Sequence, residues 1–218
     1  MTDTDEPLDY AGHIAAALHD LTKHDAASLR NVRRSVSLQI ETHAPRAVIA
    51  ISLELLRTRA PGSHVVAYEL ILHHPTALAA IRRADLRRLG QTMNSWGEVD
   101  TFACYVAGRA WRAGQIRDDV IIQWTRSRNH WWRRAALVST VPLNVRAQGG
   151  GGDPDRTLAI CDLLAEDRHP MVSKALSWAL RELAVRDAAA VRSFLDDAQD
   201  RLPASVIREV RSKLTIAP

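Results

Sequence analysis

The chain has 218 residues, of which 46% are hydrophobic and 25% are charged, and its formal net charge is +4. This composition excludes a disordered protein, and the length is sufficient for a sizeable buried core in one domain or one continuous array. No apolar run approaches the roughly 18 residues of a membrane span and no signal peptide opens the chain, so we expect a cytoplasmic protein.

Helical periodicity dominates the chain from residue 8 onward. Residues 1–7 are acidic and without pattern, and we expect them to form a flexible tail. No later stretch shows the period-two alternation of strands, so the predicted fold class is all-α. Helices are expected over residues 8–22 and 28–42, from Pro45, over 63–74, from Pro75, over 91–111 and 118–125, and after Asn129, Pro154, Pro170, Asp187 and Pro203.

The regular succession of helices favours a repeat architecture. Helices of similar length joined by short loops form antiparallel pairs, and a pair that cannot bury its own apolar face needs a neighbour. No identical repeat is visible, so we expect a degenerate HEAT-like solenoid, an α–α superhelix, as a single domain over residues 8–218. A compact helical bundle is the alternative.

Several chemistry-bearing residues fit no metal or cofactor motif. Cys104 and Cys161 lie in separate helices without ligand partners at suitable spacing, so we expect reduced core residues. His73 and His74 precede a proline at a helix end, where we expect exposed capping residues. The glycine run of residues 148–152 lacks the lysine of a phosphate-binding loop and is expected to be a flexible loop. The sequence therefore predicts no metal and no cofactor.

The stretch 91–111 holds the first candidate site. Trp96 and Asp100 are four residues apart and share one face of a helix. An aromatic ring beside a carboxylate can hold a positive charge, because the ring offers its negative π face and the carboxylate its full charge. The apolar stripe of this helix is separate and consists of Val99, Phe102, Val106 and Ala110.

The helix from Pro170 places a second tryptophan among cations. Lys174, Trp178 and Arg181 follow helical spacing on one face. This arrangement suits either a tryptophan packed on a neighbouring helix beside long cationic stems, or a ligand-binding face with phosphate-binding cations. The opposite face carries the apolar stripe Val172, Leu176, Ala179 and Leu183.

The helix after Asn129 carries two consecutive arginines. Arg133 and Arg134 could form a solvated face or a structural ion pair, which is the usual role of such charges. With Trp132 beside them they could instead grip a sugar–phosphate backbone.

Five segments together resemble the DNA alkylation repair family of HEAT-like-repeat DNA glycosylases, the AlkD-like proteins. The segments are, in order, SWGEVD, AGRAWRAG, WTRSRNHWWRRAALVSTV, VSKALSWALREL and REVRSKL, and the resemblance covers roughly residues 28–213. It implies a solenoid with a concave basic groove for duplex DNA. It also implies a monofunctional hydrolase that releases N3- and N7-alkylated purines without a metal, a cofactor or base flipping.

The resemblance also assigns residues. It implies a catalytic role for Asp100 beside Trp96 and Trp178, and a groove arginine at either Arg133 or Arg134. The better-known members have a second tryptophan and an acid where this chain has Ser95 and Gly97. The remaining expected DNA contacts are Lys174, Arg181, Arg211 and Lys213.

Two further functions stay open from the residues alone. The first is a non-catalytic module that binds damaged or branched DNA through its arginines, and the second is a scaffold for an acidic protein partner. For the glycosylase we expect a bacterial, nucleoid-associated monomer whose partner is double-stranded DNA that carries alkylated purines.

Overall fold

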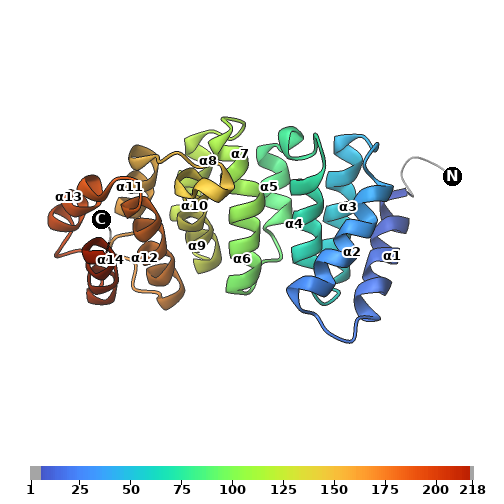
Figure 1. Cartoon of the computed structure of the whole chain (residues 1–218), viewed down its shortest axis with the longest axis horizontal. Helices are drawn as coiled ribbons and strands as arrows, with labels where there is room; N and C mark the ends of the chain where they lie inside the picture. Colours follow the sequence, from blue (N-terminus) through green and yellow to red (C-terminus); the bar gives the residue numbers. More distant parts are fainter. Residues whose placement is uncertain (1–5, 217–218) are drawn as a thin grey trace. The chain divides into compact units, whose positions relative to one another are not determined.

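The computed structural model describes residues 6–216 (Figure 1). All regular secondary structure in this part of the chain is helical, which confirms the all-α prediction. The chain forms two compact units that divide between Met93 and Asn94. The single-domain assignment and the concave groove stay predictions. Of the predicted tail, residues 1–5 lie outside the described residues, whereas Glu6 and Pro7 already belong to the first helix.

The first unit consists of helices in two rows. Helix α3 packs against α1 and α5, and α4 packs against both α3 and α2. This side-by-side stacking of helices agrees with the predicted HEAT-like repeat. The elements are α1 (Glu6–His19), α2 (Ala26–Gln39), α3 (Pro45–Thr58), α4 (Ser63–His73), the 3-10 turn η1 (Leu78–Ala80) and α5 (Arg83–Leu89).

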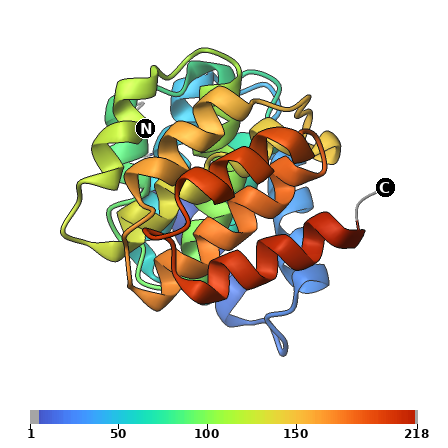
Figure 2. The ribbon, with the colours of Figure 1, turned by 90° about the vertical axis from the view of Figure 1, so that its left-hand side faces the viewer.

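The second unit contains one row of four helices. Helix α9 packs against α6 and α12, and α12 packs against α14. Figure 2 looks onto the end where α12, α13 and α14 lie together. The elements are α6 (Trp96–Phe102), η2 (Ala103–Ala107), α7 (Gly108–Arg112), α8 (Asp118–Thr125), α9 (His130–Val138), α10 (Val141–Asn144), η3 (Arg146–Gln148), α11 (Pro154–Leu163), α12 (Pro170–Ala184), α13 (Ala188–Asp197) and α14 (Ala204–Ile216).

Local signals account for the helix ends that the sequence predicts well. Asp153 and Asp187 each accept a hydrogen bond from a backbone N–H in the first turn of the next helix. The expected helix 118–125 occurs with those bounds. The four residues of the apolar stripe of α12 are fully buried, as are those of the stripe that follows Trp96.

Two local predictions are wrong. The helix expected from Pro75 is only the short turn η1, and α5 begins at Arg83, where Asp85 accepts a hydrogen bond from the backbone N–H of Arg82 at 2.9 Å. The glycine run does lie in a loop, but the expectation of a flexible loop is wrong at Gly150. This residue is buried and lies so close to the backbone of Leu143 that a Cβ would be 2.6 Å from its carbonyl carbon.

The described residues also hold two reduced cysteines and no membrane span. Cys104 and Cys161 are buried and unpaired with each other, which confirms the predicted core role. Burial, followed by the charge of Asp100, raises the pKa of the Cys104 thiol to about 12. No helix between residues 6 and 216 is both long enough and apolar enough to cross a membrane.

Candidate functional site

The first turn of α6 is fixed by two side-chain caps. The Ser95 hydroxyl accepts a hydrogen bond from the backbone N–H of Glu98 at 3.4 Å, and the Glu98 carboxylate accepts one from the backbone N–H of Asn94 at 2.7 Å. The first bond satisfies an N–H group that a helix start leaves unpaired, and the second ties the residue before the N-cap to the first turn. Trp96 is the first residue of this turn, and 62% of its surface is exposed. The site thus presents a large aromatic ring to solvent from a well-anchored helix end.

Asp100 lies one turn further along α6 and forms a two-point ion pair with Arg134. The Arg134 Nε donates to Asp100 Oδ1 at 2.8 Å, and its Nη2 donates to Oδ2 at 2.7 Å. The exposed fractions are 7% for the Arg134 side chain and 17% for the Asp100 side chain. A carboxylate oxygen with one hydrogen bond keeps a second lone pair, so the exposed edge of Asp100 can still accept a proton or orient water.

Arg134 also connects α6 to α12, the helix that carries Trp178. Its Nη1 donates to the backbone carbonyl of Met171, in the first turn of α12, at 2.6 Å. One buried guanidinium on α9 therefore joins α6 to α12. Trp178 lies seven residues after Met171, about 10 Å further along the same face of α12.

The two consecutive arginines separate into different roles. Arg133 Nε donates to the Asp167 carboxylate at 2.6 Å, and its Nη1 donates to the carbonyls of Ser127 and Arg128. Consecutive helical residues differ by about 100° in direction, which explains why only Arg134 reaches Asp100. The structural ion pair considered for these arginines thus occurs at both positions, and Arg134 is the one beside the candidate site.

We expect Arg133→Gln to lower the free energy of unfolding by about 1–3 kcal/mol, because it leaves Asp167 partly buried without its cation. DNA affinity at constant salt should stay unchanged if Arg133 acts only in the fold. Urea unfolding and a binding titration on the same preparation would measure both. A protein of unchanged stability and weaker DNA binding would instead assign Arg133 to the DNA interface.

Trp178 is half-buried and oriented by a carboxylate that the sequence analysis did not single out. Its indole Nε1–H donates to Glu182 Oε1 at 2.9 Å, one helical turn away. Lys174 is exposed, and Arg181 is half-buried with its Nε donating to the carbonyl of Ser177 at 3.3 Å. The four-residue spacing between Trp178 and Glu182 was the available signal for this contact.

The last two expected DNA contacts do not share a face. Arg211 is exposed and donates to the side chain of Gln199 at 2.9 Å, whereas Lys213 is half-buried. Residues two apart on α14 point to opposite sides of the helix, so one surface cannot easily use both. The hydrogen bonds of the Asp100–Arg134 pair involve neither of them.

An aromatic cluster supports the site from within the unit. The Trp132 ring lies 4.9 Å from the Trp124 ring and 6.0 Å from the Phe102 ring, measured between centroids. These distances are typical of packed aromatic pairs. Trp132, on α9, therefore packs against α6 and α8. Since Arg133 and Arg134 are both held in ion pairs, the interpretation that these arginines grip a sugar–phosphate backbone together with Trp132 stays a prediction.

A π-helical turn follows the candidate site. Residues Ala103–Ala107 form this turn within the continuous run from Trp96 to Arg112, and Arg109 Nε donates to the carbonyl of Cys104 at 3.2 Å. Next to the turn, Gly108 approaches α9 so closely that a Cβ would lie 2.4 Å from the carbonyl oxygen of Ser139. Helical periodicity alone did not predict the π turn. On either side of the π turn the packing partner differs, because α6 and the turn itself pack against α9, whereas α7 packs against α10.

Two stacked histidines join the starts of α9 and α12. The rings of His130 and His169 lie 3.8 Å apart with an interplanar angle of 17°. His169 Nδ1 accepts a hydrogen bond from the backbone N–H of Met171 at 3.2 Å and caps α12. Burial lowers the pKa of His130 below its ordinary value of 6.5, with a further contribution from His169 and Arg133.

The lowered pKa of His130 gives stability a defined pH dependence. The unfolded chain takes up this proton near pH 6.5, and the folded chain only at lower pH, so this contribution is present above about pH 6.5 and is lost as the pH falls. We expect a modest loss of stability from pH 7 to about pH 5. Replacing His130 by asparagine should flatten the profile measured by urea unfolding, and an unchanged slope would exclude His130 as its source.

Comparisons with known proteins place these features in context. A family model described as "DNA alkylation repair enzyme" matches residues 15–214. The structure is similar to one described as a predicted DNA alkylation repair enzyme from Enterococcus faecalis, with a TM-score of 0.72 and 15% identity. That similarity covers 97% of this chain and 96% of the other, and at this identity it supports the fold alone. A search of curated proteins gave no match.

Proposed function

Because the chain belongs to the family of DNA alkylation repair enzymes, and thus has a role in DNA repair, we propose that it is a monofunctional alkylpurine DNA glycosylase. It hydrolyses the N-glycosidic bond of N3- or N7-alkylated purines in duplex DNA, without flipping the base. The observation that carries the proposal is the position of the Asp100 carboxylate. Asp100 lies on the same face of α6 as exposed Trp96, and buried Arg134 holds both of its carboxylate oxygens.

The chemistry of the substrate matches this arrangement. An alkylated purine such as 7-methylguanine carries a positive charge and leaves without prior protonation. The remaining barrier is the positive charge that develops on the sugar as the bond breaks. Asp100 stabilises that charge and orients or deprotonates the attacking water, because a fixed carboxylate needs no rearrangement during the reaction.

The two tryptophans act on the nucleotide itself. Trp96 and Trp178 offer π faces to a cationic base or sugar, which favours charged lesions over ordinary purines. The Trp178 ring is held by its hydrogen bond to Glu182, so its orientation is defined before DNA binds. Lys174 and Arg181 lie one helical turn to either side and contact phosphates, which supplies salt-dependent affinity. We propose a monomer as the acting species.

The direct test is release of free base from duplex DNA that contains 7-methylguanine or 3-methyladenine. Chromatography separates the released base, and alkaline cleavage of the strand reports the abasic site that remains. The proposal requires both signals, since a monofunctional enzyme leaves the strand intact before alkali. Absence of free base from either lesion at excess enzyme would refute it.

A second candidate function is DNA binding without excision, and one observation favours it. Both oxygens of Asp100 are engaged by Arg134, which is also the geometry of a purely structural ion pair. This function predicts salt-sensitive binding to lesion-containing or branched duplexes with no released base. Affinity that is indifferent to salt would exclude it.

A further inference from the structure

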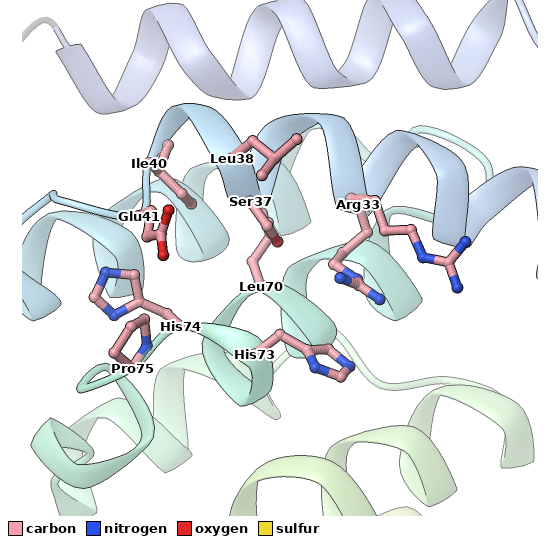
Figure 3. Close-up of a pocket in the computed structure, with 10 residues that line it drawn as sticks. Arg33, Ser37, Leu38, Ile40, Glu41, Leu70, His73, His74 and Pro75 are labelled. Carbon is pink, nitrogen blue, oxygen red and sulfur yellow. The ribbon is translucent and has the colours of Figure 1, made fainter.

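A pocket in the first unit is unrelated to the Asp100 site. It has a volume of about 350 Å³ and lies between the C-terminal parts of α2 and α4 (Figure 3). This is large enough for a small organic ligand. The expectation that His73 and His74 are both exposed caps is wrong here, because His74 is 7% exposed and lines this pocket.

His74 presents an unpaired donor in a defined tautomer. Its Nδ1 accepts hydrogen bonds from the backbone N–H groups of Thr76 at 3.3 Å and Ala77 at 3.1 Å. An accepting Nδ1 carries no proton, so the ring proton is on Nε2. Nε2 is buried and has no partner among the described residues. A buried N–H without an acceptor is unfavourable, and because Nε2 is shielded from solvent, a ligand acceptor would satisfy it once the pocket wall that covers it shifts.

A second buried polar atom in the same pocket lacks a partner. The Ser37 hydroxyl on α2 forms no hydrogen bond within residues 6–216. Figure 3 shows Ser37 and Leu70 between the two ends of the pocket, with Leu38 above them. Leu38 is 78% exposed, which is unusual for a large apolar side chain. The middle of the pocket therefore has an apolar surface, with one unpaired hydroxyl group shielded just beneath it.

The two ends of the pocket differ in charge. Arg33 and His73 lie toward one end, while Glu41 and His74 lie at the other (Figure 3). Part of the Arg33 charge is compensated by Glu69, to which its Nε donates at 3.2 Å. Exposed Arg34 also lines the pocket and adds a second guanidinium. A matching ligand has an anionic group at one end and a donor–acceptor edge at the other.

We propose that this pocket binds a nucleoside monophosphate. The phosphate contacts Arg34 and Arg33, which suit its geometry. The sugar lies near the Ser37 hydroxyl, and the base covers the apolar wall that includes Leu70. A nucleobase edge carries adjacent acceptors and donors, so a donor meets the Glu41 carboxylate and, after a shift of the wall that covers His74, an acceptor meets its Nε2–H. The ligand is either a free nucleotide or the terminal nucleotide of a strand, and it is independent of the excision proposed for Asp100.

The test is calorimetric titration of the whole protein with AMP. We expect saturable binding, with adenosine and ribose 5-phosphate each at least about tenfold weaker, since each lacks one end of the ligand. A 5′-phosphorylated single strand that displaces AMP would identify the strand terminus as the source. A strand that does not compete would identify the free nucleotide. No saturable AMP binding would overturn the proposal.

Three variants and one control make the assignment specific. Arg34→Ala should weaken AMP binding at least about tenfold, and Ser37→Ala at least about threefold. His74→Asn keeps an acceptor for the backbone N–H groups but withdraws the Nε2 donor, and it should also weaken binding. The matched control is Arg87→Ala, an exposed arginine of α5 outside the pocket, which should bind AMP as the wild type does. Equal affinity for Arg34→Ala, Ser37→Ala and wild type would overturn the assignment.

Discussion

Replacement of Asp100 by asparagine is expected to reduce release of 7-methylguanine from duplex DNA by at least about a hundredfold. The substitution removes the negative charge that stabilises the positive charge developing on the sugar. The amide keeps the size of the side chain and an oxygen that can accept from Arg134 Nε. It does not keep the negative charge or the capacity to take a proton from water. Single-turnover base release at saturating enzyme measures the effect on the chemical step.

The same substitution acts on the fold, so stability must be followed in parallel. Arg134 would stay buried with a neutral partner, and we expect a loss of about 1–3 kcal/mol in the free energy of unfolding. Assays well below the melting temperature separate this loss from the loss of chemistry. A folded Asp100→Asn protein that releases base at the wild-type rate would remove Asp100 from the mechanism.

Glu98→Gln provides a matched control on the same helix. It also replaces an acid by its amide, and the amide oxygen can still accept from the backbone N–H of Asn94. Base release should stay within about twofold of wild type if position rather than total negative charge determines the rate. A large loss in this variant would indicate that the general electrostatics of α6 matter more than Asp100 itself.

The largest effect on stability is expected at Gly108. A Cβ at this position would lie 2.4 Å from the carbonyl oxygen of Ser139 and 2.9 Å from Cγ of Pro142. Because two of the three nearest atoms are backbone oxygens, rotamer changes cannot relieve the overlap. We expect Gly108→Val to cost about 3 kcal/mol or more and to lower the melting temperature by about 6–12 °C.

Gly97→Ala is the corresponding control. Gly97 lies in the first turn of α6, and within the described chain no atom outside its own helical turn lies within 4 Å of the position that a Cβ would occupy. Alanine should therefore change the free energy of unfolding by no more than about 1 kcal/mol. The change should be stabilising, because alanine lowers the conformational entropy of the unfolded chain. Thermal unfolding followed by circular dichroism compares both variants. Equal melting temperatures for Gly108→Val and wild type would disprove the close helix contact.

Features set by local periodicity were predictable from sequence. The all-α class and the buried stripe of α12 are confirmed, because both depend only on spacing within single helices. The family is confirmed too, but it was inferred from the resemblance of five sequence segments and not from periodicity. The shared helix of Trp96 and Asp100 follows from the same rule. These two residues, Trp178 and the cationic residues stay predictions as functional groups.

Features set by distant partners were not predictable. The choice between Arg133 and Arg134 depends on carboxylates 34 residues away in opposite directions along the chain, Asp167 and Asp100. His74 precedes a proline and resembles an exposed cap, yet the packing of α2 and α4 buries it. Composition suggested a flexible loop at the glycine run, but Gly150 is needed there because no side chain fits against the neighbouring backbone.

The Arg134 guanidinium has a consequence for how this family can diverge. The carboxylate proposed for chemistry is also the counter-ion of a buried cation that joins three helices. A lineage that abandons excision and loses Asp100 would carry an uncompensated buried charge, whereas replacing both residues by apolar ones can be neutral. We therefore expect the aspartate and the arginine to be replaced together during evolution. If Asp100 has the proposed role, relatives without the aspartate are expected to lack the arginine too, and the pair would separate chains that excise bases from chains that do not.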